Sequence, residues 1–310
     1  MVEESGTRYT IDELLTLHTV APDEHEILTE GRRDASLLQW FFDTTESSIA
    51  VFAVSDRINI DFDVVIPTGL DFGEKAKVVA TAKIVNEDAL ARDTITCVVD
   101  ADYWHSVEDY DHAGIPCLLA TDYTSMEMYC FNEYILDKFL RLVLRAPKEI
   151  RASNVLTSIS SALVELYLLR WCLKMAPGSP TLPAKFLRSC SITGGVVRLN
   201  SSKLIVDALN SCSSPDVRRD SGDAIELSLQ HKVDSLNEID RRKVIGGHDF
   251  SQMLCFFLKT MHPEVLREDR RGFIDPSTTE LTLIGCLTRE LLAIEPLFKA
   301  LVARVTVSTA

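Results

Sequence analysis

The segment TITCVVDADYW, residues 94–104, decides the fold expected for this chain. It begins with an almost unbroken apolar run that ends at Asp100, a pattern typical of a strand buried on both faces of a parallel sheet. Asp100 and Asp102 follow the run with one residue between them. Because function in parallel α/β sheets collects at the carboxyl ends of strands, the segment predicts both a buried strand and a candidate site.

Around this strand, apolar runs alternate with stretches of helical spacing. Strand-like runs are expected at residues 25–30, 49–54, 62–66 and 115–120. Helical spacing is found over residues 32–42, 73–90 and 123–145. Strands that alternate with helices indicate an α/β fold with a mostly parallel sheet and right-handed crossovers.

The pattern changes after Ala146-Pro147. Helices are expected over residues 153–175, 202–210, 249–261, 278–292 and 295–305, with a short strand at 195–199 and a loop at 213–222. The expected domains are therefore an N-terminal leader (1–23), an α/β catalytic domain (24–147) and a mainly helical C-terminal domain (148–310) for dimerisation or partner binding.

The charge of the chain is unevenly distributed. The 310 residues carry 32 basic and 46 acidic side chains, a net charge of −14, which argues against coating nucleic acid by bulk electrostatics. Residues 1–150 hold 12 basic and 29 acidic side chains (12 − 29 = −17), whereas residues 151–310 hold 20 and 17 (20 − 17 = +3). The acidic half offers a surface for a partner.

The cysteines and the N-terminus indicate a reducing compartment. Eight cysteines lie in apolar segments without a CxxC pair, and the first residues lack the basic and apolar regions of a secretory signal. Apolar stretches such as residues 162–169 are interrupted by charges before they reach the roughly 20 residues of a membrane span. We expect a cytoplasmic protein with no membrane association.

Three acids are expected to meet at one edge of the sheet. Glu30 ends the first strand, and Asp100 and Asp102 end the later buried one. Spaced i, i+2, the two aspartates are expected to project to the same side. Crowded carboxylates are best neutralised by a hard divalent cation, so the sequence predicts a Mg²⁺ site, with Mn²⁺ as an alternative.

Two further acids extend the predicted metal cluster. Asp34 falls in the first turn of the helix after Glu30, and Glu127 follows the strand at 115–120. With them, two cations about 3.5 to 4 Å apart would suit phosphodiester cleavage. The alternative for both residues is a favourable charge in the first turn of a helix.

The motifs TEGRRDA, VVDADYW and TDYTSME resemble the Toprim fold of OLD-like nucleases, topoisomerases and primases. Within it, the spacing is most similar to the AriB-type Toprim effectors of PARIS anti-phage defence systems. The resemblance covers roughly residues 24–145.

This resemblance implies a Mg²⁺-dependent nuclease. It would give Glu30 the role of general base or metal-bound acid, Asp100 and Asp102 the role of metal ligands, and Asp34 and Glu127 the places of additional acids. It further implies a toxic defence effector that cuts RNA, with tRNA favoured, or DNA. A partner ATPase would hold it until release, after which it would form a homodimer.

Several basic residues are candidates for binding substrate phosphate. Arg32 and Arg33 directly follow Glu30-Gly31, and Lys77 lies on the helix expected at 73–90. Arg141 and Arg145 recur at helical spacing and would form a basic stripe with Lys148. His248, in a Gly-Gly-His-Asp sequence, is a further candidate, although a plain loop residue is the alternative.

Two other classes of function remain open. A glycosyltransferase also uses Asp-x-Asp after a buried strand to hold a Mn²⁺-bound nucleotide sugar, but it gives Glu30 no role. In a non-catalytic interaction module, the acids would have no metal to bind. No P-loop or dinucleotide-binding glycine pattern is present, so ATP use by this chain has no support.

Overall fold

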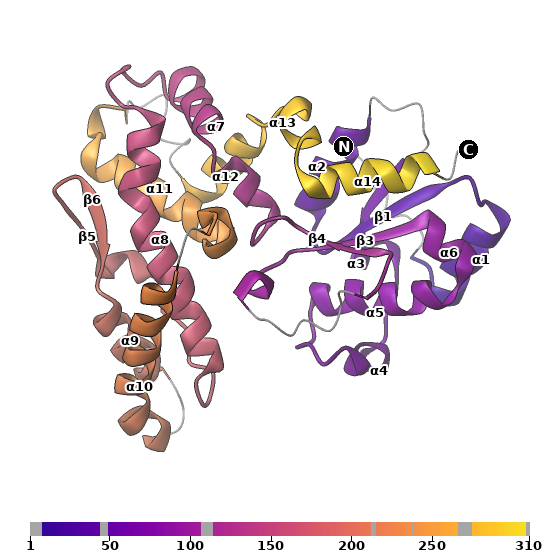
Figure 1. Ribbon diagram of the computed structural model, residues 1–310, viewed down its shortest axis with the longest axis horizontal. Coiled ribbons are helices and arrows are strands. Elements are labelled where there is room, and N and C mark those ends of the chain that lie inside the picture. Colours follow the sequence, from indigo (N-terminus) through magenta and orange to yellow (C-terminus); the bar gives the residue numbers. More distant parts are fainter. Residues whose placement is uncertain are drawn as a thin grey trace. The chain divides into compact units, whose positions relative to one another are not determined.

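The structure is a computed structural model that describes residues 8–43, 49–106, 114–211, 215–236, 239–265 and 275–307. It forms two compact units (Figure 1): unit 1 comprises Met1–Asp122 and Thr288–Ala310, and unit 2 comprises Tyr123–Leu287. Unit 1 contains a parallel sheet flanked by helices, and unit 2 is mainly helical. The predicted fold class is therefore confirmed.

The sheet of unit 1 has four parallel strands in the order β2-β1-β3-β4. The strands are β1 (His25–Thr29), β2 (Ile49–Ala53), β3 (Ile95–Val99) and β4 (Leu118–Ala120). Every residue of the two central strands, β1 and β3, is buried. This burial explains why β3 is an almost continuous apolar run in the sequence. Strand β1 buries polar residues as well, among them His25 and Glu26.

Helices cover both faces of this sheet. On one face, Phe41 of α2 (Arg32–Phe42) packs edge-on against Phe298 of α14 (Pro296–Val307), with ring centroids 4.8 Å apart. On the other, Val78 and Val79 of α5 (Glu74–Glu87) join the core cluster that contains strand residues of β1 and β3. Figure 1 shows α2 and α14 on one side of the strands and α5 on the other.

The stretch expected to be a leader contains a packed helix. Helix α1 (Ile11–Val20) begins with a capping box, in which Thr10 and Glu13 each satisfy the other's backbone N–H. Leu14 on this helix is completely buried in the core of unit 1. The apolar contact of α1 thus makes it part of the α/β unit.

The strand expected at residues 62–66 is wrong. The structure has a short helix there, α4 (Phe62–Val65), followed by a 3₁₀ turn (Ile66–Thr68). Val65 is 1% exposed, whereas Phe62 is 59% exposed, so the run is not a buried strand. Three further short helices complete the unit: α3 (Val54–Arg57), α6 (Ala89–Thr94) and α13 (Arg289–Ala293).

The division of the chain differs from the predicted boundary at 147/148. The first segment of unit 1 ends at Asp122, and the chain returns to unit 1 from Thr288 onward. Arg304 of α14 explains the return, because its guanidinium donates hydrogen bonds to Thr96 Oγ1 (3.0 Å) and to the carbonyls of Arg92 (2.6 Å) and Pro116 (2.8 Å). These contacts tie the end of the chain to β3 and its surroundings.

Unit 2 is built from helices and a small antiparallel hairpin, β5 (Cys190–Thr193) with β6 (Val196–Leu199). Its α-helices are α7 (Glu133–Lys138), α8 (Ala152–Met175), α9 (Ser201–Asn210), α10 (Pro215–Ser235), α11 (Gly247–Met261) and α12 (Pro276–Ile284). Shorter helical turns lie between them, including η3 (Met126–Cys130) and η6 (Arg241–Val244).

Two expectations for unit 2 are corrected. The loop expected at 213–222 falls largely within α10, which starts at Pro215, a residue well suited to a helix's first position. The long helix expected at 123–145 is divided into η3, α7 and a π-helical turn (Phe139–Val143). Asn132 caps α7 through the N–H of Tyr134, which separates α7 from η3.

Helix α8 is the one described helix whose length and composition would allow a membrane span. In its apolar window, 61% of the residues are buried inside the protein. The central helix of a globular unit has the same character, so this is weak evidence for a span. Six of the seven described cysteines are also buried, as expected of small apolar side chains.

Candidate functional site: acids at the carboxyl edge of the sheet

The sheet places its switch point between β1 and β3. From β1 the chain passes to β2 on one side, and from β3 it passes to β4 on the other. Ligands of open parallel sheets bind in the crevice at the carboxyl ends of such strands. Glu30 directly follows β1 and Asp100 directly follows β3, so both lie at this position.

Glu30 and the turn after β3 are in direct contact. The carboxylate oxygen Oε1 of Glu30 accepts a hydrogen bond of 2.8 Å from the backbone N–H of Asp100, across 70 residues of sequence. Two strand ends predicted to meet from the sequence are thus joined through a side chain. The contact leaves the second oxygen of Glu30 as a further acceptor.

The pKa of the Glu30 carboxyl is raised from 4.5 to about 7. Burial is the main cause, and the nearby charges of Asp102 and Asp34 raise it further. The ammonium of Lys75 and the N–H of Asp100 oppose this shift without cancelling it. Negative charge at Glu30 is therefore undercompensated by the groups around it.

Asp34 approaches the site from α2. Its carboxylate folds back toward Gly31, where an added Cβ would lie 3.3 Å from Asp34 Oδ2. Glycine thus leaves room for the carboxylate beside the turn that joins β1 to α2. The predicted grouping of Asp34 with Glu30 agrees with this position and with its effect on the Glu30 pKa.

Asp102 does not continue the alternation of β3. The strand ends at Val99, and Asp102 has a φ of +45°, in the left-handed region that few non-glycine residues adopt. The turn is held by Thr121, whose Oγ1 accepts a hydrogen bond of 2.9 Å from the N–H of Ala101. The i, i+2 argument for Asp100 and Asp102 therefore does not apply, because both residues lie beyond the strand.

The sequence leaves open whether Lys75 faces phosphate or is a solvated charge on its helix, and in the structure it lies on α5 beside the acids. Its ammonium donates hydrogen bonds to the carbonyl of Asp100 and to Asp102 Oδ2 (2.7 Å), and it lies 4.4 Å from the ring centre of Trp104. The side chain is 16% exposed. Lys75 thus brings one positive charge to the acids, where a surface charge on a helix was the default expectation.

The donor set of this site fits a hard divalent cation. The charges of Asp34 and Asp102 contribute to the raised Glu30 pKa, although burial is the larger cause, and Asp100 begins the turn that contains Asp102. Carboxylate oxygens are the donors that such a cation prefers. These four residues would hold the ion. When bound, it would neutralise phosphate charge and lower the pKa of a bound water.

The predicted phosphate-binding residues of unit 1 contact other side chains. Arg32 forms a bidentate ion pair with Asp56, with both N–O distances at 2.7 Å. Lys77 binds Glu74 Oε1 (2.7 Å) and Ser55 Oγ (2.8 Å). Arg33 is exposed on α2. A role in phosphate binding would require Arg32 and Lys77 to exchange these contacts.

In unit 2, Arg141 has a local structural role. Its guanidinium binds Asp137 (3.1 Å) and the carbonyls of Ala146, Pro147 and Ile150. Arg145 is exposed and has a φ of +46°, so the regular helix has already ended there. The predicted basic stripe of Arg141, Arg145 and Lys148 on one continuous helix is therefore absent from this described segment.

Glu127 and His248 are neighbours within unit 2. Glu127 lies in η3, and His248 lies in the first turn of α11, with 3.9 Å between Glu127 Oε1 and His248 Nδ1. Glu280 of α12, which the sequence did not single out, is 3.1 Å from the same nitrogen. The sequence offers one more basic group for nucleic acid, Arg267 with Arg270 and Arg271, and it lies outside the described residues.

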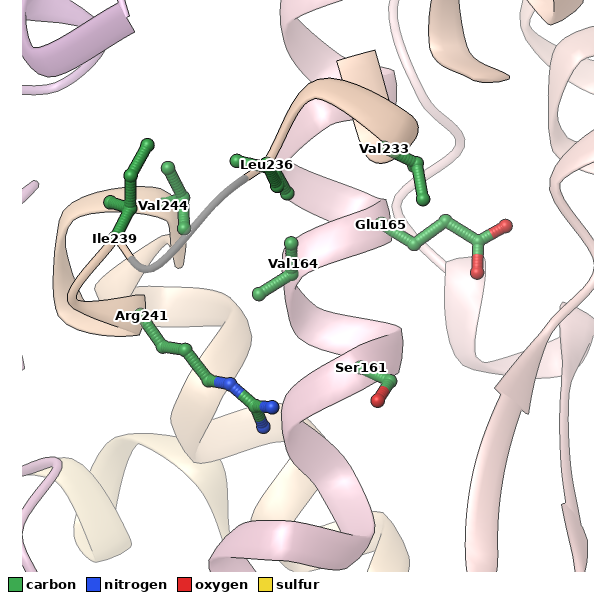
Figure 2. A pocket seen from close by; sticks show the side chains of 8 residues that line it. All are labelled: Ser161, Val164, Glu165, Val233, Leu236, Ile239, Arg241 and Val244. Atoms are coloured by element: carbon green, nitrogen blue, oxygen red, sulfur yellow. The ribbon is translucent and has the colours of Figure 1, made fainter. Parts of the chain in front are cut away.

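Unit 2 also contains a mostly apolar pocket of about 300 Å³. Figure 2 shows Val164 of α8 near Leu236 and Val244, while the Glu165 carboxylate points away from Val164. Glu165 instead accepts a hydrogen bond of 2.8 Å from Ser201 Oγ. A second cavity, of about 500 Å³, is lined by residues around Lys185, Arg188 and Lys203. Neither pocket contains a predicted site residue.

Comparisons with protein-family models and with curated proteins give no match.

The raised Glu30 pKa predicts a pH dependence of stability in the metal-free protein. The folded-state pKa of about 7 exceeds the unfolded value of 4.5, so the folded state holds the proton on Glu30 more tightly than the unfolded state does. This contribution to the free energy of unfolding is complete below pH 4.5 and is lost as the pH rises through 7. Glu30→Gln should therefore stabilise the protein at pH 8, by roughly 1–2 kcal/mol after allowance for partial solvent exposure.

Urea unfolding in EDTA at pH 5 and pH 8 measures this effect. The gain from Glu30→Gln should be larger at pH 8 than at pH 5. Glu87→Gln is the matched control, because Glu87 is exposed at the end of α5. An equal effect of Glu30→Gln at both pH values would contradict the shifted pKa.

Proposed function

We propose that this protein is a metal-dependent endonuclease of the Toprim type. The observation that carries the proposal is the hydrogen bond between Glu30 and the N–H of Asp100, at the switch point of a parallel sheet. It supports the pairing of a glutamate after the first strand with an Asp-x-Asp after a later one. That pairing is the pattern on which the Toprim resemblance rests.

Each residue has a distinct proposed role. Asp34, Asp100 and Asp102 would hold Mg²⁺ or Mn²⁺ together with Glu30. With its pKa near 7, Glu30 also suits proton transfer from an attacking water at neutral pH. Lys75 keeps Asp102 and the turn after β3 in place, and its ammonium can attract phosphate oxygens.

The nucleic acid and the partners are proposed from the resemblance. The substrate would be RNA, with tRNA favoured, or DNA, and the protein would act as a toxic effector in defence against phages. A partner ATPase would restrain it, and the strongly acidic residues 1–150 support a charged docking surface. The active form would be a cytoplasmic homodimer.

The glycosyltransferase alternative is less well supported. It uses the Asp-x-Asp pair but leaves unexplained why Glu30 is held against Asp100 by a hydrogen bond. The burial of the Glu30 carboxyl also lowers the stability of the fold when that carboxyl is charged. Buried groups with strongly shifted pKa values are concentrated at functional sites. A nuclease gives that carboxyl a chemical task.

Metal removal tests the proposed function. The purified full-length protein, incubated with total tRNA or with plasmid DNA, should cleave one of them in 5 mM Mg²⁺ or Mn²⁺. Cleavage should stop in excess EDTA and resume when the metal is restored, as resolved on denaturing gels. Because restraint by a partner is proposed, a second experiment tests activity in cells. The wild type and Glu30→Ala are expressed in a bacterial host, RNA ends are sequenced and the integrity of the DNA is examined. Ends identical to those of a Glu30→Ala strain, with intact DNA in both, would reject the nuclease.

A further inference from the structure

Unit 2 holds a second cluster of metal-ligating side chains: Glu127, His248 and Glu280. They come from three separate elements, η3, α11 and α12. One potential ligand atom from each residue lies within 4.8 Å of the other two. His248 Nδ1 lies 3.1 Å from Glu280 Oε2 and 3.9 Å from Glu127 Oε1, so it stands between two carboxylates.

Glu280 is buried and Glu127 is half-buried, whereas the imidazole is open to solvent. The side chains of Glu280 and Glu127 are 6% and 12% exposed, and that of His248 is 73% exposed. Burial is the main cause of the raised pKa of the Cys130 thiol, and the charges of Glu127 and Glu280 raise it further. The negative charges of Glu127 and Glu280 are therefore both felt at the buried Cys130. A cation close to the two carboxylates would stabilise them.

Gly247 lets η3 approach the start of α11 closely. A Cβ at this position would overlap Ser125 Oγ and would lie 2.9 Å from Glu127 Oε2. The Oγ of Ser125 is itself buried and has no hydrogen-bond partner among the described residues. An unsatisfied polar atom thus lies beside the Glu127 carboxylate, as expected where a bound ion and its water complete the polar contacts.

We propose that Glu127, His248 and Glu280 bind one divalent first-row transition-metal ion, of which Zn²⁺ is the representative. An imidazole nitrogen among the donors favours such ions over Mg²⁺ and Ca²⁺. Tetrahedral Zn²⁺ with N and O ligands at about 2.0–2.2 Å places ligand atoms roughly 3.3–3.6 Å apart. The observed 3.1 and 3.9 Å lie on either side of that range.

This site goes beyond the proposed nuclease site, because its residues belong to unit 2 and its donors include nitrogen. Its exposed side leaves a fourth position for water. The ion would join η3 to α11 and α12, which lie far from it in the sequence, so binding should stabilise unit 2. The rival explanation is an imidazolium that balances the two acids without a metal.

Zn²⁺ titration of the full-length protein tests the proposal. With 5 mM Mg²⁺ present throughout, calorimetry at pH 7.5 should give one Zn²⁺ per chain. His248→Ala and Glu280→Gln should each weaken its binding by roughly 10- to 100-fold or more. Zn²⁺ at a hundredfold excess over Kd should raise the Tm of the wild type by roughly 5 °C.

The matched control is His262→Ala. His262 Nδ1 forms a similar 3.2 Å contact with Glu264 Oε1, but within the part of the chain that the structure describes these two residues have no third ligand beside them. This variant should bind Zn²⁺ like the wild type. Glu30→Gln should also bind Zn²⁺ like the wild type, because Glu30 belongs to the proposed nuclease site. This result would show that the two sites are distinct.

Two results would overturn the proposal: no Zn²⁺ binding to the wild type, or binding that His248→Ala leaves unchanged. The imidazolium alternative predicts the first of these. Because His248 is exposed, its substitution should leave the Tm in EDTA within about 2 °C of the wild type. Glu280→Gln keeps the shape of a buried side chain and serves as a second, independent variant.

Discussion

Replacement of Glu30 by glutamine is expected to lower Mg²⁺-dependent cleavage of nucleic acid by about 10²- to 10⁴-fold, the range typical of a lost general base. Glutamine keeps the shape of the side chain and can still accept the hydrogen bond from the Asp100 N–H. It removes the charge and the ability to take up a proton from water. The expected loss is therefore chemical rather than structural.

Single-turnover cleavage of the substrate found for the wild type measures this loss. The rate constant should fall in Glu30→Gln, whereas Glu87→Gln, an exposed change on the same unit, should retain it. The pH profile in Mg²⁺ adds a second reading, since the wild-type rate should rise with pH as the Glu30 carboxyl loses its proton, whereas glutamine has no such proton to lose. Full cleavage by Glu30→Gln would reject the role of Glu30 as the general base.

The same substitution should have opposite effects on activity and stability. It removes a carboxylate whose burial disfavours its charge, so the metal-free fold gains stability at pH 8 while the chemistry is lost. A purely structural carboxylate would behave differently, since its removal would weaken the fold. This opposition distinguishes a functional Glu30 from one that only ends a strand.

Much of the α/β unit was predictable because its elements have strong local patterns. The predicted helix at 32–42 agrees with α2, and the runs at 25–30 and 94–100 contain β1 and β3. The approach of Glu30 to Asp100 followed from topology alone, since carboxyl ends of neighbouring parallel strands meet at one edge. Local periodicity was sufficient to predict a helix or strand wherever the buried residues follow the period of that element.

The errors arose where local patterns were ambiguous. The run at 62–66 is rich in β-formers, yet Val65 is buried and Phe62 is exposed on a short helix. The turn-like residues at 213–222 lie mostly in α10, because proline favours a helix start as well as a turn. Composition alone does not separate these outcomes.

Contacts between distant residues were beyond the sequence patterns. Lys75 has the same local signature as any charge on a helix, and only the fold brings it to Asp102. Glu280 likewise carries no local signal, since its partner His248 lies 32 residues away in the chain. The return of Arg304 to Thr96 spans 208 residues and could not be read from spacing.

The largest expected loss of stability follows from Arg57→Met in unit 1. Arg57 forms two hydrogen bonds with the carboxylate of Glu26, a residue that is 3% exposed on β1, and its guanidinium lies 4.5 Å from the ring centre of Tyr9. Methionine would fill similar space but would remove the guanidinium, leaving the His18 imidazole, 3.6 Å away, beside the buried carboxylate. We expect a loss of about 3–5 kcal/mol in the free energy of unfolding at pH 7.

Two comparisons make this prediction specific to the buried charge. In the double variant Glu26→Gln/Arg57→Met the buried charge is gone, so most of the loss should be recovered. Arg32→Met breaks a bidentate pair with Asp56 of the same chemistry but with Arg32 75% exposed, and it should cost no more than about 1 kcal/mol. Equal losses in the two single variants would contradict the role of burial.

The pH dependence of the Arg57→Met loss gives its physical origin. Burial raises the pKa of the Glu26 carboxyl, but the nearby His18 imidazole and the Arg57 guanidinium outweigh it, so the folded-state pKa lies below 4.5. In the wild type this stabilisation is present above pH 4.5 and is lost as the pH falls through the folded-state pKa. Without Arg57, one of the two groups that lower the Glu26 pKa is lost, so the folded-state pKa rises and the variant gains relative stability as the pH falls. The difference in unfolding free energy should therefore shrink in acid, and urea unfolding from pH 7 to pH 4 measures it.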